Sequence, residues 1–283
     1  MRRAQEGGLP VSGLRSLTPG AAGPLRALGL PSRGVLLALS LCCGAVFIGL
    51  ATLVLPKDSK AAVVLLDYSS ATIFPYPITI QNFMHLAFFL GLGEVFVRTM
   101  VAVWERRFLM RTLLPEDDET ILEADDLAPL RLQVAGEFDA ENGFLPYLLD
   151  LCILQFFASR SVDQVVSVLN SSLELIAHRV DLRYSLLRYL VWMIPTMGFI
   201  GTVVGIAAAL SLIDPQNPDL QLVTANLAVA FNTTIIALGE SAILVFLLGS
   251  TQRREEEAVN LAGSYCLKNL VNRLYAPAHQ RAS

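Results

Sequence analysis

Two long uncharged segments joined by a short polar turn constrain this chain more than any other feature. Residues 189–213 hold 25 residues without a charge, and residues 220–239 hold 20 more. At about 1.5 Å per residue, ~20 helical residues cross a hydrocarbon core of roughly 30 Å. The connection at 214–219 reads DPQNPD, and its prolines end a helix. The pattern therefore predicts a transmembrane helical hairpin.

Each helix of this hairpin carries small and hydroxyl residues at steps of four, three and four. These are Gly198, Thr202, Gly205 and Ala209 on the first helix, and Ala230, Thr234, Ala237 and Ser241 on the second. Such steps place side chains on one helix face. Counted from the turn, Thr202 and Thr234 lie roughly 16 to 21 Å along their helices. We therefore expect the two hydroxyls at one depth, near the middle of the membrane.

The stripes of small residues have two interpretations. Small residues let membrane helices pack closely, and Gly201 and Gly205 also form a GxxxG pair. A threonine can return its hydroxyl to its own backbone, so it is compatible with packing alone. The matched depth of Thr202 and Thr234 suits instead a lined path for an ion, or a surface for a partner helix. The residues alone leave both open.

Composition agrees with a membrane protein. Hydrophobic residues make up 54% of the 283 residues and charged residues 16%, whereas a soluble domain averages ~25% charged. Two more segments with few charges bring the predicted spans to four. The spans are 34–55, 78–104, 188–213 and 220–250.

Basic residues predict the orientation. Arginines are frequent in 1–33, a segment expected to be disordered, and they flank the spans on that same side. The segment 214–219 has no Lys or Arg, and 56–77 has only two lysines. Because basic residues favour the cytoplasmic side, both termini are predicted in the cytoplasm, together with 105–187 and 251–283.

The segment 105–187 is predicted to be a helical cytoplasmic domain. Residues 143–159 read as a buried helix, and a capping-box sequence at 161–164 starts a helical apolar pattern. Because no Gly or Pro follows before Pro195, one long helix is predicted to begin in the cytoplasm and run directly into the third span. The fourth span similarly extends into 251–283. The predicted fold class is all-α, with four transmembrane helices.

Ionisable residues inside the spans are few. Glu240 lies ~20 residues, or roughly 30 Å, from the outer turn, which predicts a position at the inner hydrocarbon boundary. It is either a polar contact or part of a proton exit. His85 is predicted to be a polar contact between helices. Glu94 and Arg98 are four residues apart, so they can pair along one helix face, and they are expected toward the inner interface.

No enzyme signature is found, since the chain has no GxSxG, P-loop or HExxH motif. Its four cysteines have neither metal-site nor disulfide-framework spacing, so no cofactor or metal is expected. The net charge of −4 disfavours nucleic-acid binding. Acidic residues within 116–126 form either a solvated face or a docking surface for a basic partner.

Two motifs of the hairpin resemble a known family. GFIGTVVGI at 198–206 and AFNTTIIAL at 230–238 resemble the paired motifs of the MotA/TolQ/ExbB proton-channel family, in the family's order and on adjacent spans. Thr202 and Thr234 match the family threonines. Ala237 stands where the family usually has glycine, and Val229 where ExbB-like members often carry glutamate. The four-span layout resembles that of MotA.

The resemblance implies a ring, commonly a pentamer, in the cell inner membrane. The ring would surround paired helices of a single-span ExbD/TolR/MotB-like partner that carries an essential aspartate. Ion flow, with the proton as the expected ion, would drive mechanical work. The competing hypothesis is a non-conducting membrane scaffold in which the stripes only pack the four spans.

The resemblance also suggests roles for residues of the hairpin. Thr202, Thr234 and Ser241 are expected to line the ion path, and Glu240 is the candidate proton exit. The residues expected to pack against the partner helices are Gly198, Gly205, Ala209, Ala230 and Ala237.

Overall fold

A computed structural model describes residues 25, 28–57, 59–67, 76–111, 113–116, 120–137, 143–211, 213 and 220–275. The elements in these residues are all helices, which confirms the predicted all-α class. They are α2 (Arg33–Val54), α3 (Lys60–Leu66), α4 (Ile80–Leu109), α5 (Ala124–Glu137), α6 (Phe144–Ser159), α7 (Val162–Arg183), α8 (Ser185–Ser211), α9 (Leu220–Asn269) and the 3-10 turn η2 (Val271–Arg273).

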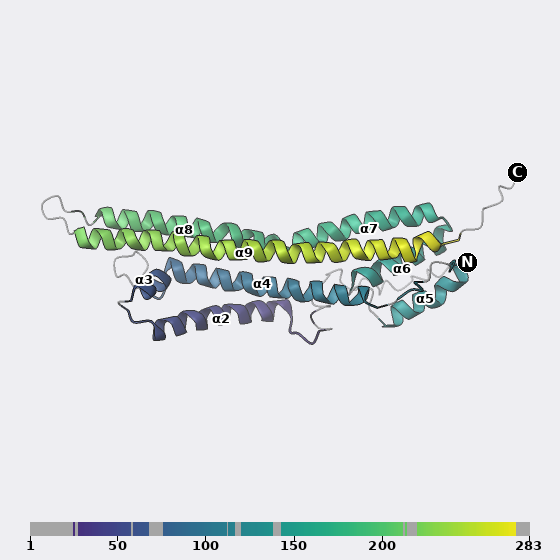
Figure 1. Cartoon of the computed structure of the whole chain (residues 1–283), viewed down its shortest axis with the longest axis horizontal. Helices are drawn as coiled ribbons and strands as arrows, with labels where there is room; N and C mark the ends of the chain where they lie inside the picture. The colour runs from purple at the N-terminus through teal and green to yellow at the C-terminus, as the bar shows by residue number, and fades with distance from the viewer. Residues whose placement is uncertain are drawn as a thin grey trace, which may run out of the picture.

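The helices form an elongated bundle around α9, which runs almost the whole length of the molecule (Figure 1). Helices α7 and α8 follow each other along one side of α9, and α4 and α2 lie on the other. Helices α5 and α6 gather at one end, here named the domain end. At the opposite end, named the tip end, α8 and α9 extend past α2 and α4. Four helical stretches are long and apolar enough to cross a membrane, as predicted.

The path from α7 into α8 has one break, at Tyr184. The long helix predicted to enter the third span is confirmed over 162–211, and its one irregular residue is Tyr184, where φ is −88° and ψ is 0°. Neither Gly nor Pro causes the break. The carboxylate of Glu255, fully buried on α9, accepts hydrogen bonds from the Tyr184 hydroxyl at 2.8 Å and from Arg183 at 2.7 Å. These bonds pin the junction of α7 and α8 against α9.

Pro195 lies inside α8 without ending it. Proline has no N–H, so the carbonyl of Val191, four residues earlier, loses its helical donor. The hydroxyl of Ser241 on α9 donates to that carbonyl at 3.0 Å. A donor from the neighbouring helix thus satisfies the backbone group that proline frees, as apolar surroundings require.

The domain end has its own apolar core. Helix α6 is buried there as predicted, with Leu148, Leu149, Cys152, Ile153 and Phe156 all fully buried. Residues of α7 and of the last turns of α9 complete the cluster. Ser161 caps α7 by accepting a hydrogen bond from the N–H of Gln164. This core joins the ends of three long helices.

Buried charges fix α2 against α4. Arg98 donates to Glu94 at 2.8 Å, which confirms the predicted pair, and Arg33 at the start of α2 donates to the other oxygen of Glu94 at 3.0 Å. Glu94 and Arg98 are at most 1% exposed. At the other end of α2, Thr52 contacts Tyr76. These contacts set the level of α2 along the bundle.

Several predicted segments lie outside the described residues. They include the turn at 214–219, most of 1–33 and the acids at 117–119. The predicted domain limits and the two sides of the membrane remain predictions.

Candidate functional site

The two motif threonines meet between α8 and α9. The hydroxyl of Thr202 contacts the hydroxyl of Thr234, which confirms that they lie at one depth. Both oxygens are also within hydrogen-bond distance of the carbonyl of Gly198, at 3.2 Å each. Thr202 reaches the carbonyl of Ala230 as well, at 3.1 Å. Both side chains are half-buried, so the contact lies at an edge of the helix pair.

This contact gathers four oxygen atoms, two from hydroxyls and two from carbonyls. Two hydroxyl hydrogens can be shared among the carbonyls of Gly198 and Ala230 and between the two hydroxyl oxygens. Such a group can exchange hydrogen bonds with water or coordinate a small cation. It does not titrate near neutral pH, so a proton carried past it needs an acid elsewhere.

The small residues of the stripes pack α8 directly against α9. A Cβ added at Gly205 would lie 2.6 Å from the Cβ of Ala230, and one at Gly198 would overlap the Cβ of Ala237. Ala209, Ala230 and Ala237 are at most 1% exposed. The contact expected with a partner helix is therefore occupied here by the chain's own hairpin, and the predicted role toward a partner is untested.

Ser241 of the stripe and Thr233 beside it have contacts that the sequence did not indicate. The hydroxyl of Ser241 donates its hydrogen bond to the Val191 carbonyl and does not contact the threonine hydroxyls. Thr233 is 3% exposed, and its hydroxyl would lie 2.8 Å from a Cβ at Gly201. The adjacent threonines of α9 thus differ, because Thr233 faces α8 squarely and Thr234 sits at its edge. The 4-3-4 spacing of small residues does not indicate which of two adjacent threonines faces the neighbouring helix.

Glu240 pairs with His85 between α9 and α4. The distance between Nδ1 of His85 and Oε1 of Glu240 is 2.5 Å, and both residues are at least nine-tenths buried. This confirms His85 as a polar contact between helices. The sequence missed its partner, although Glu240 is the only acid between Leu220 and Gln252.

The hydrogen bonds of His85 fix where its hydrogens lie. Its Nε2 is 2.9 Å from the carbonyl oxygen of Leu65 on α3. A carbonyl only accepts, so Nε2 carries a hydrogen, and one further proton is shared between Nδ1 and Oε1. The other oxygen of Glu240, Oε2, is buried and has no hydrogen-bond partner in the described part of the chain. It is an open position for a proton or a water.

The level of Glu240 along the bundle follows from its pairing with His85. His85 precedes Glu94 by nine residues, about 13 Å along α4, and Glu94 marks the domain end of α2. Helix α2 is 22 residues long, or about 33 Å. Glu240 therefore lies level with the middle third of α2. The position of Glu240 at the inner hydrocarbon boundary stays a prediction, and the count from the tip differs from the level of α2 because the α8–α9 tip extends past α2 and α4 (Figure 1).

The comparisons with known proteins agree with the motifs. Residues 149–262 match the model of the MotA/TolQ/ExbB proton channel family. The match includes Thr202, Thr234, Ser241 and Glu240, whereas His85 precedes it. No curated protein and no solved structure matches the chain. The match, with four long apolar helices, indicates a multi-pass membrane protein, and the matched family is one of proton channels rather than a known enzyme class.

Proposed function

Because residues 149–262 match the model of the MotA/TolQ/ExbB proton channel family, we propose that this chain is a ring-forming subunit of an ion-driven motor or channel complex in the cell inner membrane. The ring, a pentamer with both termini of each subunit in the cytoplasm, surrounds paired helices of a single-span ExbD/TolR/MotB-like partner. The observation that carries the proposal is the contact of Thr202 with Thr234 inside the matched segment.

The threonine contact supplies half of an ion path. Its oxygens provide neutral hydrogen-bonding groups at an edge where both side chains are only half-buried. The titratable group at that depth then comes from the partner, as an aspartate. Moving one proton down a potential of 100 mV releases about 2.3 kcal/mol, which the complex converts into mechanical work.

We propose the partner helices at this half-buried edge rather than on the small-residue stripe. The stripe is already buried in the packing of α8 against α9, at Gly198, Gly205, Ala209, Ala230 and Ala237. Their predicted packing against a partner would require the two helices to separate. A helix that passes the edge reaches the hydroxyls of Thr202 and Thr234 without such a change.

Glu240 is the proposed next position of the proton. It lies six residues beyond Thr234 toward the domain end, about 9 Å along α9. Its unpartnered Oε2 can take a proton while the His85 contact holds the other oxygen in place. A Glu240→Gln variant keeps an oxygen and the side-chain shape but removes the acid. We expect it to bind the partner normally and to conduct far less.

The proposal is tested by reconstitution with a co-expressed single-span protein that has an aspartate near the start of its helix. Both proteins are purified together, placed in liposomes, and an inward pH gradient is imposed while internal pH is recorded. The proposal predicts co-purification and a proton flux that is absent with either protein alone.

The scaffold hypothesis predicts a different outcome. In that case the stripes only pack the helices, and the chain forms a stable complex with no ion dependence. A purified complex that contains no single-span acidic protein and leaves the pH gradient intact would favour the scaffold and overturn the proposed function.

A further inference from the structure

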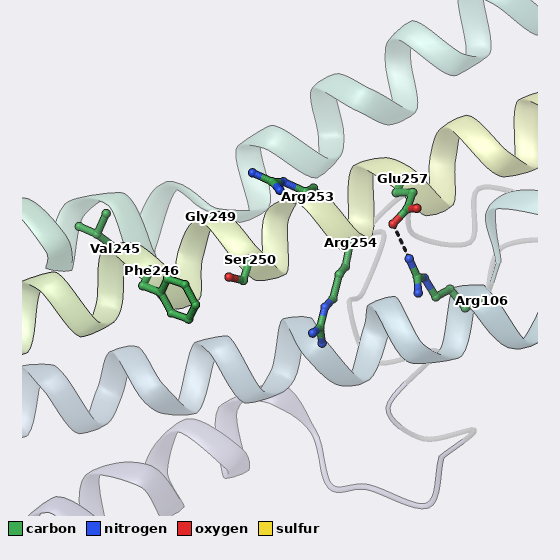
Figure 2. A pocket seen from close by; sticks show the side chains of 8 residues that line it. All are labelled: Arg106, Val245, Phe246, Gly249, Ser250, Arg253, Arg254 and Glu257. Atoms are coloured by element: carbon green, nitrogen blue, oxygen red, sulfur yellow. Dashed lines mark hydrogen bonds and ion pairs between the residues drawn. The ribbon is translucent and has the colours of Figure 1, made fainter.

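A hollow of about 540 Å³ opens between α4 and α9, toward the domain end. Figure 2 shows its lining. The residues are Arg106, Val245, Phe246, Gly249, Ser250, Arg253, Arg254 and Glu257. All but Arg106 come from α9, and they fall into two rows at steps of four, Val245–Gly249–Arg253–Glu257 and Phe246–Ser250–Arg254. Each row passes from an apolar residue through a small one to an arginine, and the first row then ends at Glu257.

One end of the hollow is cationic and incompletely bonded. Arg253 and Arg254 are exposed and make no hydrogen bond or ion pair within the described residues. Arg106 pairs with Glu257 through Nη2, but its Nε is buried without an acceptor in that same part of the chain. The lining thus holds three arginines and one glutamate, and a buried N–H of Arg106 is left without an acceptor in the described residues. This end suits an anion with several oxygens.

The other end of the hollow is apolar and open. Phe246 is 73% exposed and Val245 is 50% exposed. A Cβ added at Gly249 would meet no atom within 4 Å, so the groove between the two ends is unobstructed. Figure 2 shows Phe246 and Arg254 both extending from α9 toward α4. An anionic group and an apolar chain can therefore lie along the same face of α9.

We propose that this hollow binds an anionic phospholipid. The phosphate accepts hydrogen bonds from Arg253 and Arg254 and from the free N–H of Arg106, and an acyl chain lies over Phe246 and Val245. The site lies where the apolar part of α9 meets its first basic residues, which is the level of lipid headgroups. A free phosphate would use only the cationic end. The apolar end favours a lipid.

The test measures lipid bound to the purified protein in a neutral detergent, with phosphatidylglycerol or phosphatidylcholine added. Each basic residue near an anionic headgroup is worth about a factor of five in affinity, so Arg253→Gln with Arg254→Gln should weaken phosphatidylglycerol binding roughly 25-fold. Arg107→Gln is the matched control, since Arg107 is exposed near the same end of α4 but does not line the hollow. Phe246→Ser should weaken lipid binding without affecting free phosphate.

Three outcomes would overturn the proposal, and none depends on ion flux. The double variant could bind phosphatidylglycerol as the control does, which removes the site. Inorganic phosphate could compete fully for bound lipid, which would make the hollow a free-phosphate site. The double substitution could instead change the oligomeric state without changing bound lipid, which would make this face a contact between copies of the chain.

Discussion

Helix α9 makes two contacts that are chemically opposite. Against α8 it presents Ala230, Thr233 and Ala237, which are uncharged and small enough for the helices to touch at glycines. Against α4 it presents Glu240 to His85 and Glu257 to Arg106. The first contact depends on shape and on hydrogen bonds between uncharged groups. The second depends on exact pairing of charges, which in an apolar environment is expensive to disturb.

The largest effect is expected from breaking the charged contact. Glu240→Ala leaves His85 buried without its partner and should lower the free energy of unfolding by about 3–5 kcal/mol. The double variant His85→Leu with Glu240→Met replaces both partners by apolar groups and should recover much of that loss. Thermal unfolding of the unsubstituted protein and of both variants in one detergent measures how much stability the double variant recovers. Equal losses for the single and double variants would show that the pair is not linked.

Substitutions that change the shape of the uncharged contact between α8 and α9 should cost nearly as much stability as breaking the charged contact. Gly205→Ala places a Cβ 2.6 Å from the Cβ of Ala230 and 3.0 Å from its backbone, so a helix must shift. We expect a loss of about 1–3 kcal/mol. Gly239→Ala is the matched control on α9, because its Cβ would meet nothing within 4 Å, and it should be neutral or slightly stabilising. Similar unfolding temperatures for the two variants would contradict close packing.

A smaller effect is expected at the proline of α8. Ser241→Ala leaves the Val191 carbonyl without a donor and should cost about 1–2 kcal/mol. In a Pro195→Ala background the restored N–H can serve that carbonyl, so the same substitution should cost clearly less. A double-mutant cycle by chemical unfolding gives the comparison. An unchanged cost in the two backgrounds would assign Ser241 some other role.

The smallest effect concerns pH at the domain end. Burial raises the pKa of the Cys152 thiol to about 12, above the unfolded value near 8.5. The folded state therefore holds this proton more tightly, so its contribution is present below pH 8.5 and is lost as pH rises toward 12. Above pH 9 the unfolding free energy should fall less steeply for Cys152→Ala, by up to about 1.4 kcal/mol per pH unit. Cys42→Ala, at an exposed position, should keep the original slope.

Much of the fold was predictable from where charges are absent. The four spans, the long extension of α9 and the buried helix α6 follow from uncharged length and helical periodicity, which are local properties. The turn at Tyr184 could not be predicted, because the hydrogen-bond partner of Tyr184 is Glu255, some seventy residues away on α9. No local pattern marks it.

The candidate site was predictable to a similar extent. The common depth of Thr202 and Thr234 followed from counting residues from a shared turn. The pairing of Glu240 with His85 depends on how far α9 is staggered against α4, and no turn of fixed length connects these two helices. The level of Glu240 relative to α2 could not be predicted for the same reason, since its position was counted only from the tip.

The most direct test of the central claim is proton flux through the reconstituted complex with Thr234→Val. The substitution removes one hydroxyl of the threonine contact while keeping side-chain volume. Thr224→Val on the same helix is the matched control, because its hydroxyl returns only to carbonyls of its own helix. The account predicts that both variants assemble with the partner and that only Thr234→Val loses ion-driven flux. Normal flux through Thr234→Val would contradict it.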